Sequence, residues 1–524
     1  MKKNKFDICL TDGVLNIYTP SLDLFKSDNK RLLKIGDISI KTFISLHLSK
    51  LNGQFLILGT LKDGKLLAIT DRWSSIHIYF NMKKKHFSFD LDYSSEINED
   101  ALFSLFYSRR LFSDNTLYKY FKKINAGQIA TIDQNGSLSI KYWISRVFNQ
   151  KEAVFIDPKK ISDRLIELTG KFKDLSLFIS GGLDTRTILA AGDKSWKSAT
   201  TLAFSNDSRE LKIAEQLCNL NYVKHNKIIL DIKDWSKHIN KAILHSKHGY
   251  VINSLFLVMP NRDIPHITGI GLDYMFQGMY LNSRMITEDI NIENIVRFLP
   301  CGNRYISKES DLHKSKPFKN MLEKIRSEIL PEDQNSDYID TMRKILFDDP
   351  SMHYSFTDYF SQTARVPSII LSFDRILDDI WQSLDYRQLF NKQLMIEVLK
   401  NINIKFCNVI SANNNLPLDY NNLDRLILYL KNGISRILTK RKFEHEIRTW
   451  PTQGYMAKEL LTFFGHEYFI HKSNNFDTSW MRHKTFEEEL NWFQARTKEN
   501  RFARKHCDRE NNFLYMLNIL LVAS

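Results

Sequence analysis

A short run from Phe178 to Leu189, FISGGLDTRTIL, constrains the fold more than any other part of the sequence. Apolar residues lead into two glycines, Gly181 and Gly182, after which helical apolar spacing begins at once. Two residues without side chains between a strand and a helix leave several backbone N–H groups unpaired at the positive end of the helix dipole. The sequence therefore predicts an anion cradle that suits phosphate groups.

The acid in this turn indicates a metal ion beside the phosphates. Asp184 would repel a bare phosphate, so its position predicts a cation between them, and magnesium on a pyrophosphate satisfies both groups. Ser180 and Thr185 are expected to donate hydroxyl hydrogen bonds to phosphate oxygens. The alternative is a tight structural turn in which Asp184 only favours the start of the helix. The order of strand, glycines, acid and hydroxyl favours the phosphate site.

The segments around this turn predict a doubly wound, largely parallel sheet, because strands and helices alternate along them. Strands are expected at 175–180, 198–204, 225–230 and 264–271, and helices at 161–172, 184–192 and 207–220. Asp207 and Glu210, at capping-box spacing, are expected to open the last of these helices. Ligands of such sheets bind beyond the carboxyl ends of the strands, where the glycine turn is expected.

Residues 1–150 have a different texture and are expected to form a separate α+β, sandwich-like domain. Asp63-Gly64 and Asn135-Gly136 each separate two apolar runs, as tight hairpin turns do. Residues 98–112 have helical spacing. The second domain is expected to extend over 155–524 and to be mostly helical after about residue 340.

Composition narrows the class of protein. The chain has 524 residues, 43% of them hydrophobic, which suits a globular protein with a sizeable core. Its five cysteines are scattered singly, as in a reducing compartment, and no run approaches the ~18 apolar residues of a membrane span. We expect a cytoplasmic protein without a membrane partner. The formal charge of +14 is spread along the chain, so we expect a solvated basic surface, with an acidic ligand or partner as the alternative, and no nucleic-acid partner.

Two motifs resemble those of one enzyme family. SGGLDT at 180–185 resembles the SGGxDS pyrophosphate loop of the asparagine synthetase family, within the PP-loop ATP pyrophosphatases, with threonine in place of the last serine. TGIGLDYMFQGMY at 268–280 resembles a second motif of that family, and the matching residues are Gly269, Gly271, Asp273, Phe276, Gly278 and Tyr280. The resemblance implies that ATP and Mg²⁺ are bound and that Asp184 and Asp273 share the metal. The ATP-binding residues it implies are Ser180, Gly181, Gly182, Leu183, Asp184, Thr185, Gly269 and Gly271.

Other segments extend the resemblance over roughly residues 50 to 400. Residues 52–80 and 115–143 resemble the family's glutaminase domain, an Ntn-hydrolase-like sandwich. The strand at 198–204 resembles its adenosine-binding strand, so Leu202, Ala203 and Phe204 are expected to flank the adenine, with simple core packing as the alternative. Residues 364–387 resemble a further segment, in which Arg365 and Asp374 are expected to be structural.

The sequence departs from the family at two places. Glutamine-dependent members use cysteine as residue 2, but here residue 2 is Lys2 and Cys9 lies within the chain without a free amine. We therefore expect no glutaminase activity, and an amine that arrives as ammonia or within another molecule. Asparagine-forming members have acids where this chain has Ile270 and Tyr274, which argues against asparagine as the product. β-Lactam synthetases and lasso-peptide cyclases also vary the first of these positions.

The resemblance implies an amide-forming ligase. A carboxylate of a sugar acid, a peptide or a natural-product precursor would attack ATP to give an acyl-adenylate and pyrophosphate, and an amine would then displace AMP. The family's late lysine is not placed by any motif, although Lys392 and Lys405 are candidates. Two alternatives stay open: an RNA-modifying PP-loop enzyme, and a non-catalytic nucleotide-binding relative.

Overall fold

The computed structural model describes most of the first half of the chain and several segments of the second. The described residues are 5–230, except for 21–24, 27–28, 31–37, 93–94, 109–110, 112–113, 145–151 and 172–174; then 266–278, 281, 316–328, 340, 343, 368–411, 416–418, 420, 426, 453–474, 486–498, 517 and 520.

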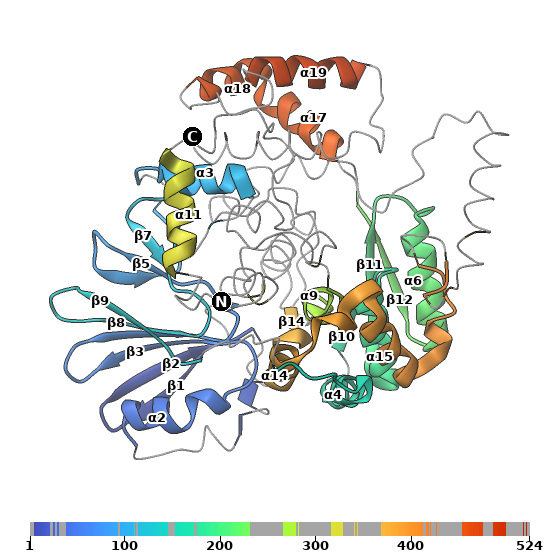
Figure 1. Cartoon of the computed structure of the whole chain (residues 1–524), viewed down its shortest axis with the longest axis horizontal. Coiled ribbons are helices and arrows are strands. Elements are labelled where there is room, and N and C mark those ends of the chain that lie inside the picture. Colours follow the sequence, from blue (N-terminus) through green and yellow to red (C-terminus); the bar gives the residue numbers. More distant parts are fainter. Residues whose placement is uncertain are drawn as a thin grey trace.

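Two antiparallel sheets make up the first domain (Figure 1). The larger has the order β1-β2-β3-β4-β8-β9, with bounds Lys5–Leu10, Gly13–Tyr18, Leu56–Leu61, Leu66–Thr70, Gln128–Ile132 and Leu138–Tyr142. The smaller has the order β6-β5-β7, with bounds His86–Ser88, Tyr79–Asn81 and Phe121–Lys123. The helices of this domain are α2 (Ile40–Leu46), the 3₁₀ turn η1 (Leu48–Lys50) and α3 (Glu99–Ser108).

Alternation along the strands explains why the larger sheet is covered on both faces. Ile57 and Ile69 belong to one buried cluster with Phe43 of α2, whereas their neighbours Leu56 and Ala68 belong to a second cluster that includes residues of the smaller sheet. Successive side chains of a strand point to opposite faces, so each strand serves both clusters. The predicted sandwich-like packing is confirmed, as are the hairpins at Gly64 and Gly136, where φ is +78° and +81°.

A five-stranded parallel sheet organises the second domain. Its order is β12-β11-β10-β13-β14, and the strands are β10 (Leu175–Phe178), β11 (Trp196–Ala203), β12 (His225–Ile229), β13 (His266–Thr268) and β14 (Ser368–Ile370). The associated helices are α4 (Pro158–Gly170), α5 (Leu183–Ala191), η2 (Asp193–Ser195), α6 (Arg209–Leu220) and α9 (Leu272–Gln277). The chain runs outward from β10 to one edge and then returns to β13 on the other side. The predicted parallel sheet is confirmed, and its order reverses between β10 and β13.

The start of α6 differs from the prediction. Ser208, rather than Asp207, is the N-cap, and its hydroxyl accepts a hydrogen bond from the N–H of Leu211 at 3.4 Å. Asp207 instead lies outside the helix, 3.6 Å from the ammonium of Lys212. The capping box was therefore misplaced by one residue, because two adjacent residues of the sequence are both good N-caps.

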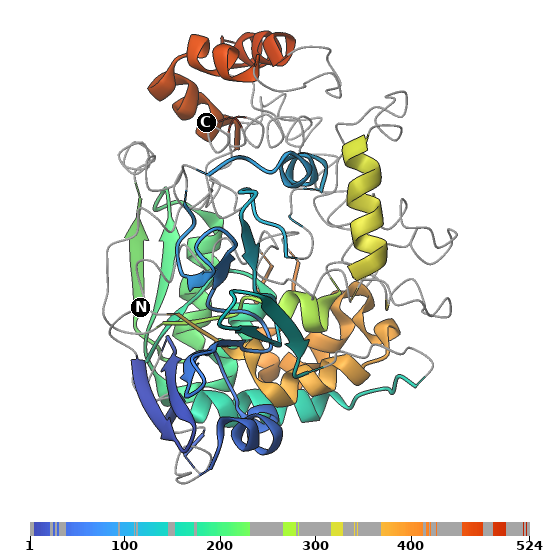
Figure 2. The ribbon, with the colours of Figure 1, turned by 90° about the vertical axis from the view of Figure 1, so that its left-hand side faces the viewer.

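Helices dominate the described residues beyond 340, as predicted. They are η7 (Leu371–Phe373), α14 (Arg375–Ser383), η8 (Tyr386–Lys392), α15 (Gln393–Asn403), η9 (Ile404–Phe406), α17 (Gln453–Phe464), α18 (His466–Ser473) and α19 (Phe486–Lys498), preceded by α11 (Lys316–Glu328). Figures 1 and 2 both show α17, α18 and α19 together at one end of the molecule. No helix in the described segments is long and apolar enough to cross a membrane.

The two domains meet through α14 and η7. The ring of Trp73, just after β4, stacks on Phe373 with centroids 5.0 Å apart and planes at 10°. Arg72 donates to Asp378 at 2.9 Å. Figure 1 shows α14 between the antiparallel sheets and the parallel sheet. The contact is therefore both apolar and ionic.

Candidate active site

The glycine turn after β10 is held by two hydroxyl groups. The backbone N–H of Ser180 donates to the Thr185 hydroxyl at 3.1 Å, and the two hydroxyls lie 3.1 Å apart. The N–H of Gly182 donates to the Ser180 hydroxyl at 3.2 Å. Gly182 is the N-cap of α5 and has no side chain with which to cap it. The start of α5 therefore lies at the carboxyl end of the central strand, with amides that suit an anion.

A second glycine segment, which follows β13, packs directly against this turn. A Cβ atom on Gly269 would lie 2.8 Å from the Cβ of Asp184 and 3.2 Å from the backbone nitrogen of Thr185, which is too close for any side chain. Gly271 has φ of +91° and forms the left-handed N-cap of α9. Since β10 and β13 pair in parallel, the two segments leave the same edge of the sheet side by side. The site thus lies where the strand order reverses, the usual ligand position in such sheets.

This packing brings the two predicted metal ligands together. Asp184 and Asp273 lie in the first turns of α5 and α9, and both residues are partly buried. Burial raises the pKa of Asp184 well above its usual value, and the charge of Asp273 raises that pKa further. Burial likewise raises the pKa of Asp273. Two partly buried acids that repel each other are a poor arrangement alone and a good one around a divalent cation, so the pair fits magnesium.

Gln277, on the last turn of α9, also contacts the pair. Its side-chain amide donates a hydrogen bond to the carboxylate of Asp184. The sequence prediction missed this residue, because a glutamine four positions after Asp273 has no distinctive signal of its own. The helical period of α9 accounts for its place, since residues four apart share one face of a helix. Gln277 therefore orients the Asp184 carboxylate.

Lys392 is a positively charged residue that acts on both of these acids. Its charge lowers the pKa of both Asp184 and Asp273, although burial outweighs that influence. It precedes α15, and both Asn391 and Lys392 have left-handed backbone conformations, with φ of +53° and +62°. Such a conformation is uncommon for lysine and typical of functional sites. Lys405, another candidate from the sequence, lies beyond the opposite end of α15.

The residues expected at the adenine divide between two faces of β11. Leu202 is buried in a small apolar cluster with Phe178 and Leu230, and Phe204 packs against that cluster. These side chains lie at the carboxyl ends of β10 and β11, next to the glycine turn. Ala203 is fully buried and, by strand alternation, points to the other face. Leu202 and Phe204 thus belong to an apolar cluster beside the glycine turn, and Ala203 lies in the core, so an adenine-binding role for the first two stays a prediction.

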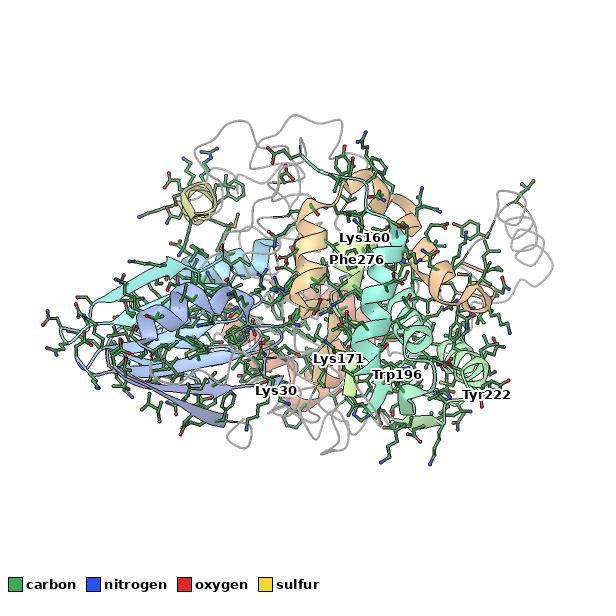
Figure 3. The ribbon with its side chains drawn as sticks, turned by 90° about the horizontal axis from the view of Figure 1, so that it is seen from below. Lys30, Lys160, Lys171, Trp196, Tyr222 and Phe276 are labelled. Carbon is green, nitrogen blue, oxygen red and sulfur yellow. The ribbon has the colours of Figure 1, made fainter. Side chains whose placement is uncertain are left out.

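Of the remaining described residues of the second motif, Tyr274 and Phe276 are buried, and Ile270 and Gly278 are partly buried. Phe276 lies among the helices of the second domain, whereas the highly exposed Tyr222 lies at its outer edge (Figure 3). Gly278 ends α9 in a left-handed conformation, where a Cβ atom would lie 2.9 Å from that of Leu389. Tyr274 is buried, and the carbonyl of Ile270 accepts a hydrogen bond from Ser372 at 2.7 Å. No carboxylate stands at either of these two positions.

Five other residues named from the sequence lie away from this site or outside the described residues. Asp374 is the N-cap of α14 and accepts from Arg164 and Asn52, which is the structural role expected of it. Cys9 is inside β1, paired with Val14. Arg365, Tyr280 and Lys2 fall outside the described residues.

No family model matches this sequence, and no curated protein matches it either. The assignment of a function therefore depends on the motifs and on the geometry of the site.

Proposed function

We propose that this protein is an ATP-dependent, amide-forming ligase of the asparagine synthetase type that lacks glutaminase activity. One observation carries the proposal: two acids and two glycine segments from neighbouring parallel strands meet where the strand order reverses. Ligands of parallel sheets bind at that position, the helix N-terminus suits phosphate, and the carboxylate pair suits a cation. Together these three features suit a magnesium-bound triphosphate. The second domain is accordingly proposed to be a PP-loop domain, and the first a degenerate Ntn-type domain.

Each group at the site has a role in this reaction. The amides at the start of α5 and the hydroxyls of Ser180 and Thr185 would bind the β- and γ-phosphates, and Lys392 would add positive charge beside them. Asp184 and Asp273 would hold Mg²⁺, which when bound neutralises charge on the departing pyrophosphate. A carboxylate oxygen of the substrate attacks the α-phosphorus and the α–β bridge breaks. An amine then attacks the acyl carbon and AMP leaves.

The substrate is a carboxylic acid other than aspartate, and the amine comes from ammonia or a second molecule. Ile270 stands where an acid would be needed in an asparagine-forming site, and its side chain packs against the core. Cys9 is fully within a paired strand, so it does not provide a glutaminase nucleophile. A sugar acid, a peptide or a natural-product precursor fits the proposal.

The alternatives make different predictions. An RNA-modifying enzyme of the PP-loop type would have no use for the two-sheet first domain, and its nucleotide turnover would depend on RNA. A non-catalytic relative would bind ATP without exchanging pyrophosphate. The close fit of Gly269 against Asp184 favours a working site, because a site without function does not require that contact.

The proposal is tested by ATP–pyrophosphate exchange across a panel of carboxylic acids. We expect exchange with wild type, formation of AMP rather than ADP on adding an amine, and loss of exchange in Asp184→Asn by at least about a hundredfold, as for removal of a principal electrostatic group. Lys392→Met should also lower exchange strongly. Lys405→Met is the matched control, because Lys405 lies at the opposite end of α15 and is exposed.

Three outcomes would contradict the proposal. ADP as the nucleotide product would exclude adenylation. Exchange that is unchanged in Asp184→Asn would exclude this aspartate as a metal ligand. Release of glutamate from glutamine by the purified protein would show that the first domain is an active glutaminase.

A further inference from the structure

Arg186, two residues after Asp184, is an unusual feature of the glycine turn. It is fully buried, in the first half of α5. Its guanidinium group donates to four backbone carbonyls: Gly181 at 3.0 Å, Phe406 at 3.0 Å, Val409 at 2.6 Å and Ile410 at 2.9 Å. One of these carbonyls belongs to the turn and the other three to the segment after α15.

Its hydrogen-bond partners in the described structure are all neutral carbonyls. A guanidinium group keeps its charge in proteins at neutral pH. The other buried arginine of this sheet region, Arg164, is paired with the carboxylate of Asp374 at 2.9 Å. A buried cation held only by neutral groups is unfavourable by itself. Its positive charge is therefore left uncancelled by these contacts, one peptide unit from the proposed phosphate site.

The bond to Gly181 sets the orientation of the peptide that carries the N–H of Gly182. A trans peptide is planar, and its C=O and N–H point in opposite directions. Because Arg186 holds the carbonyl of Gly181 on one side, the N–H of Gly182 must point to the other side, where it now contacts the Ser180 hydroxyl. Glycine backbones resist rotation less than any other, so this peptide needs an external hold.

The other three bonds connect the turn to the stretch that follows α15, the helix that Lys392 precedes. Lys392 precedes α15, and Phe406, Val409 and Ile410 follow it. The 406–410 stretch is bonded to α5 through Arg186, and at the other end of α15 the charge of Lys392 acts on Asp184. Movement at either end would change the position of Lys392 relative to the carboxylate pair.

We propose that Arg186 is a positioning residue for phosphate binding. It holds the Gly181–Gly182 peptide and the 404–410 segment together as one unit. This unit orients the amide of Gly182 toward the nucleotide and, through α15, fixes the position of Lys392. The identity of the ligand rests on the proposed function, whereas the mechanical link does not.

The test uses three variants of the full chain. Arg186→Met removes the donors and the charge, Arg186→Lys keeps the charge and up to three donors, and Thr187→Val is the control. Thr187 is buried in the same helix, and its hydroxyl donates to Leu183 at 2.8 Å. Hydrogen–deuterium exchange of the free protein and the Kd for ATP–Mg²⁺ are measured well below each melting temperature.

We expect Arg186→Met to accelerate amide exchange in both 180–185 and 404–410 and to raise the Kd for ATP–Mg²⁺ by about tenfold or more, the range for losing one charged hydrogen bond. Arg186→Lys should recover most of the affinity, and Thr187→Val should leave it within about twofold of wild type. If Arg186→Met does not fold, the partial effect of Arg186→Lys on both measurements carries the same test.

The outcomes separate this inference from the proposed function. The positioning role is overturned if Arg186→Met leaves hydrogen–deuterium exchange unchanged in 180–185 or in 404–410. It is also overturned if the ATP affinity of Arg186→Met drops no more than that of Thr187→Val, even if the melting temperature falls. If wild type binds no ATP, the proposed function fails, and the exchange measurement alone then decides whether Arg186 joins the two segments.

Discussion

At the scale of single residues, the contact between Gly269 and the start of α5 decides whether the site can form. Replacing Gly269 by alanine would place a Cβ atom 2.8 Å from that of Asp184, and nearby backbone leaves little room to adjust. We expect Gly269→Ala to lower the free energy of unfolding by about 1–3 kcal/mol, as overpacking does, and to lower pyrophosphate exchange by more than that loss explains. Denaturant unfolding and exchange kinetics on the same preparation check this.

Gly170→Ala is the matched control. Gly170 is the last residue of α4, and nothing lies within 4 Å of the position of its Cβ atom. Alanine there should leave exchange unchanged and stability equal or slightly higher, because it restricts the unfolded chain. Equal effects of the two substitutions would show that the Gly269 contact has no special importance.

The sequence predicted the residues of this site that belong to motifs and missed those that do not. Gly269 and Gly271 were found because glycine is required there, by a close approach and by a positive φ respectively. Gln277 and Arg186 were missed because their partners are distant in the chain, and nothing local marks a side chain that contacts them. Lys392 was only one candidate among several, since its position depends on how η8 leads into α15.

At the scale of elements, the carboxylate of Asp374 joins three of them. It caps α14, accepts from Arg164 of α4 at 2.9 Å, and accepts from Asn52 of the first domain at 2.9 Å. Although burial opposes the effect, these hydrogen bonds and the charge of Arg164 lower the pKa of Asp374. A lowered pKa means that the contribution to stability is present above the ordinary aspartate pKa of about 4 and is lost as the pH falls through the folded-state value.

We therefore expect Asp374→Asn, which can still cap the helix, to lower the free energy of unfolding by about 3 kcal/mol at pH 7. The difference from wild type should shrink as the pH falls below about 4, because wild type then protonates as well. Urea unfolding at a series of pH values measures it. Asp207→Asn, at an exposed position, is the control and should show little difference at any pH. A difference for Asp374→Asn that is constant from pH 7 to 3 would contradict this account.

Elements themselves were predicted well where the pattern was local. The strands β10, β11, β12 and β13 and the two hairpins follow from alternation and turn residues that lie within a few positions of one another. The order of the parallel sheet could not be derived in the same way, because it depends on which apolar faces pack together. The N-cap of α6 shows the limit of local signals, since Asp207 and Ser208 suit the position equally.

At the scale of the whole molecule, the arrangement of the two domains depends on a buried ion pair beside an aromatic stack. Arg72, which follows β4, donates to Asp378 of α14 at 2.9 Å, and Asp378 is fully buried. Next to this pair, Trp73 stacks on Phe373 and lies 6.2 Å from Trp381. Sequence patterns could not predict this contact, because Arg72 and Asp378 are 306 residues apart.

The final prediction concerns this contact. Arg72→Met removes the charge that compensates Asp378, and breaking a buried pair costs about 3–5 kcal/mol. The largest apolar clusters of the two domains are distinct, although Trp73 of the first belongs to the cluster of the second. Because the pair lies at this contact, we expect calorimetry to show one unfolding transition in wild type and two in Arg72→Met. Arg375→Met is the control, since Arg375 is on the same helix as Asp378 but is partly exposed and lies 3.6 Å from Asp379. Its loss should lower the free energy of unfolding by less than about 1 kcal/mol. Two transitions in wild type, or equal effects of both variants, would show that the domains are not coupled through Arg72. Coupling matters for function because α14 leads through η8 to Lys392, so loosening the first domain should also lower pyrophosphate exchange at temperatures where both domains remain folded.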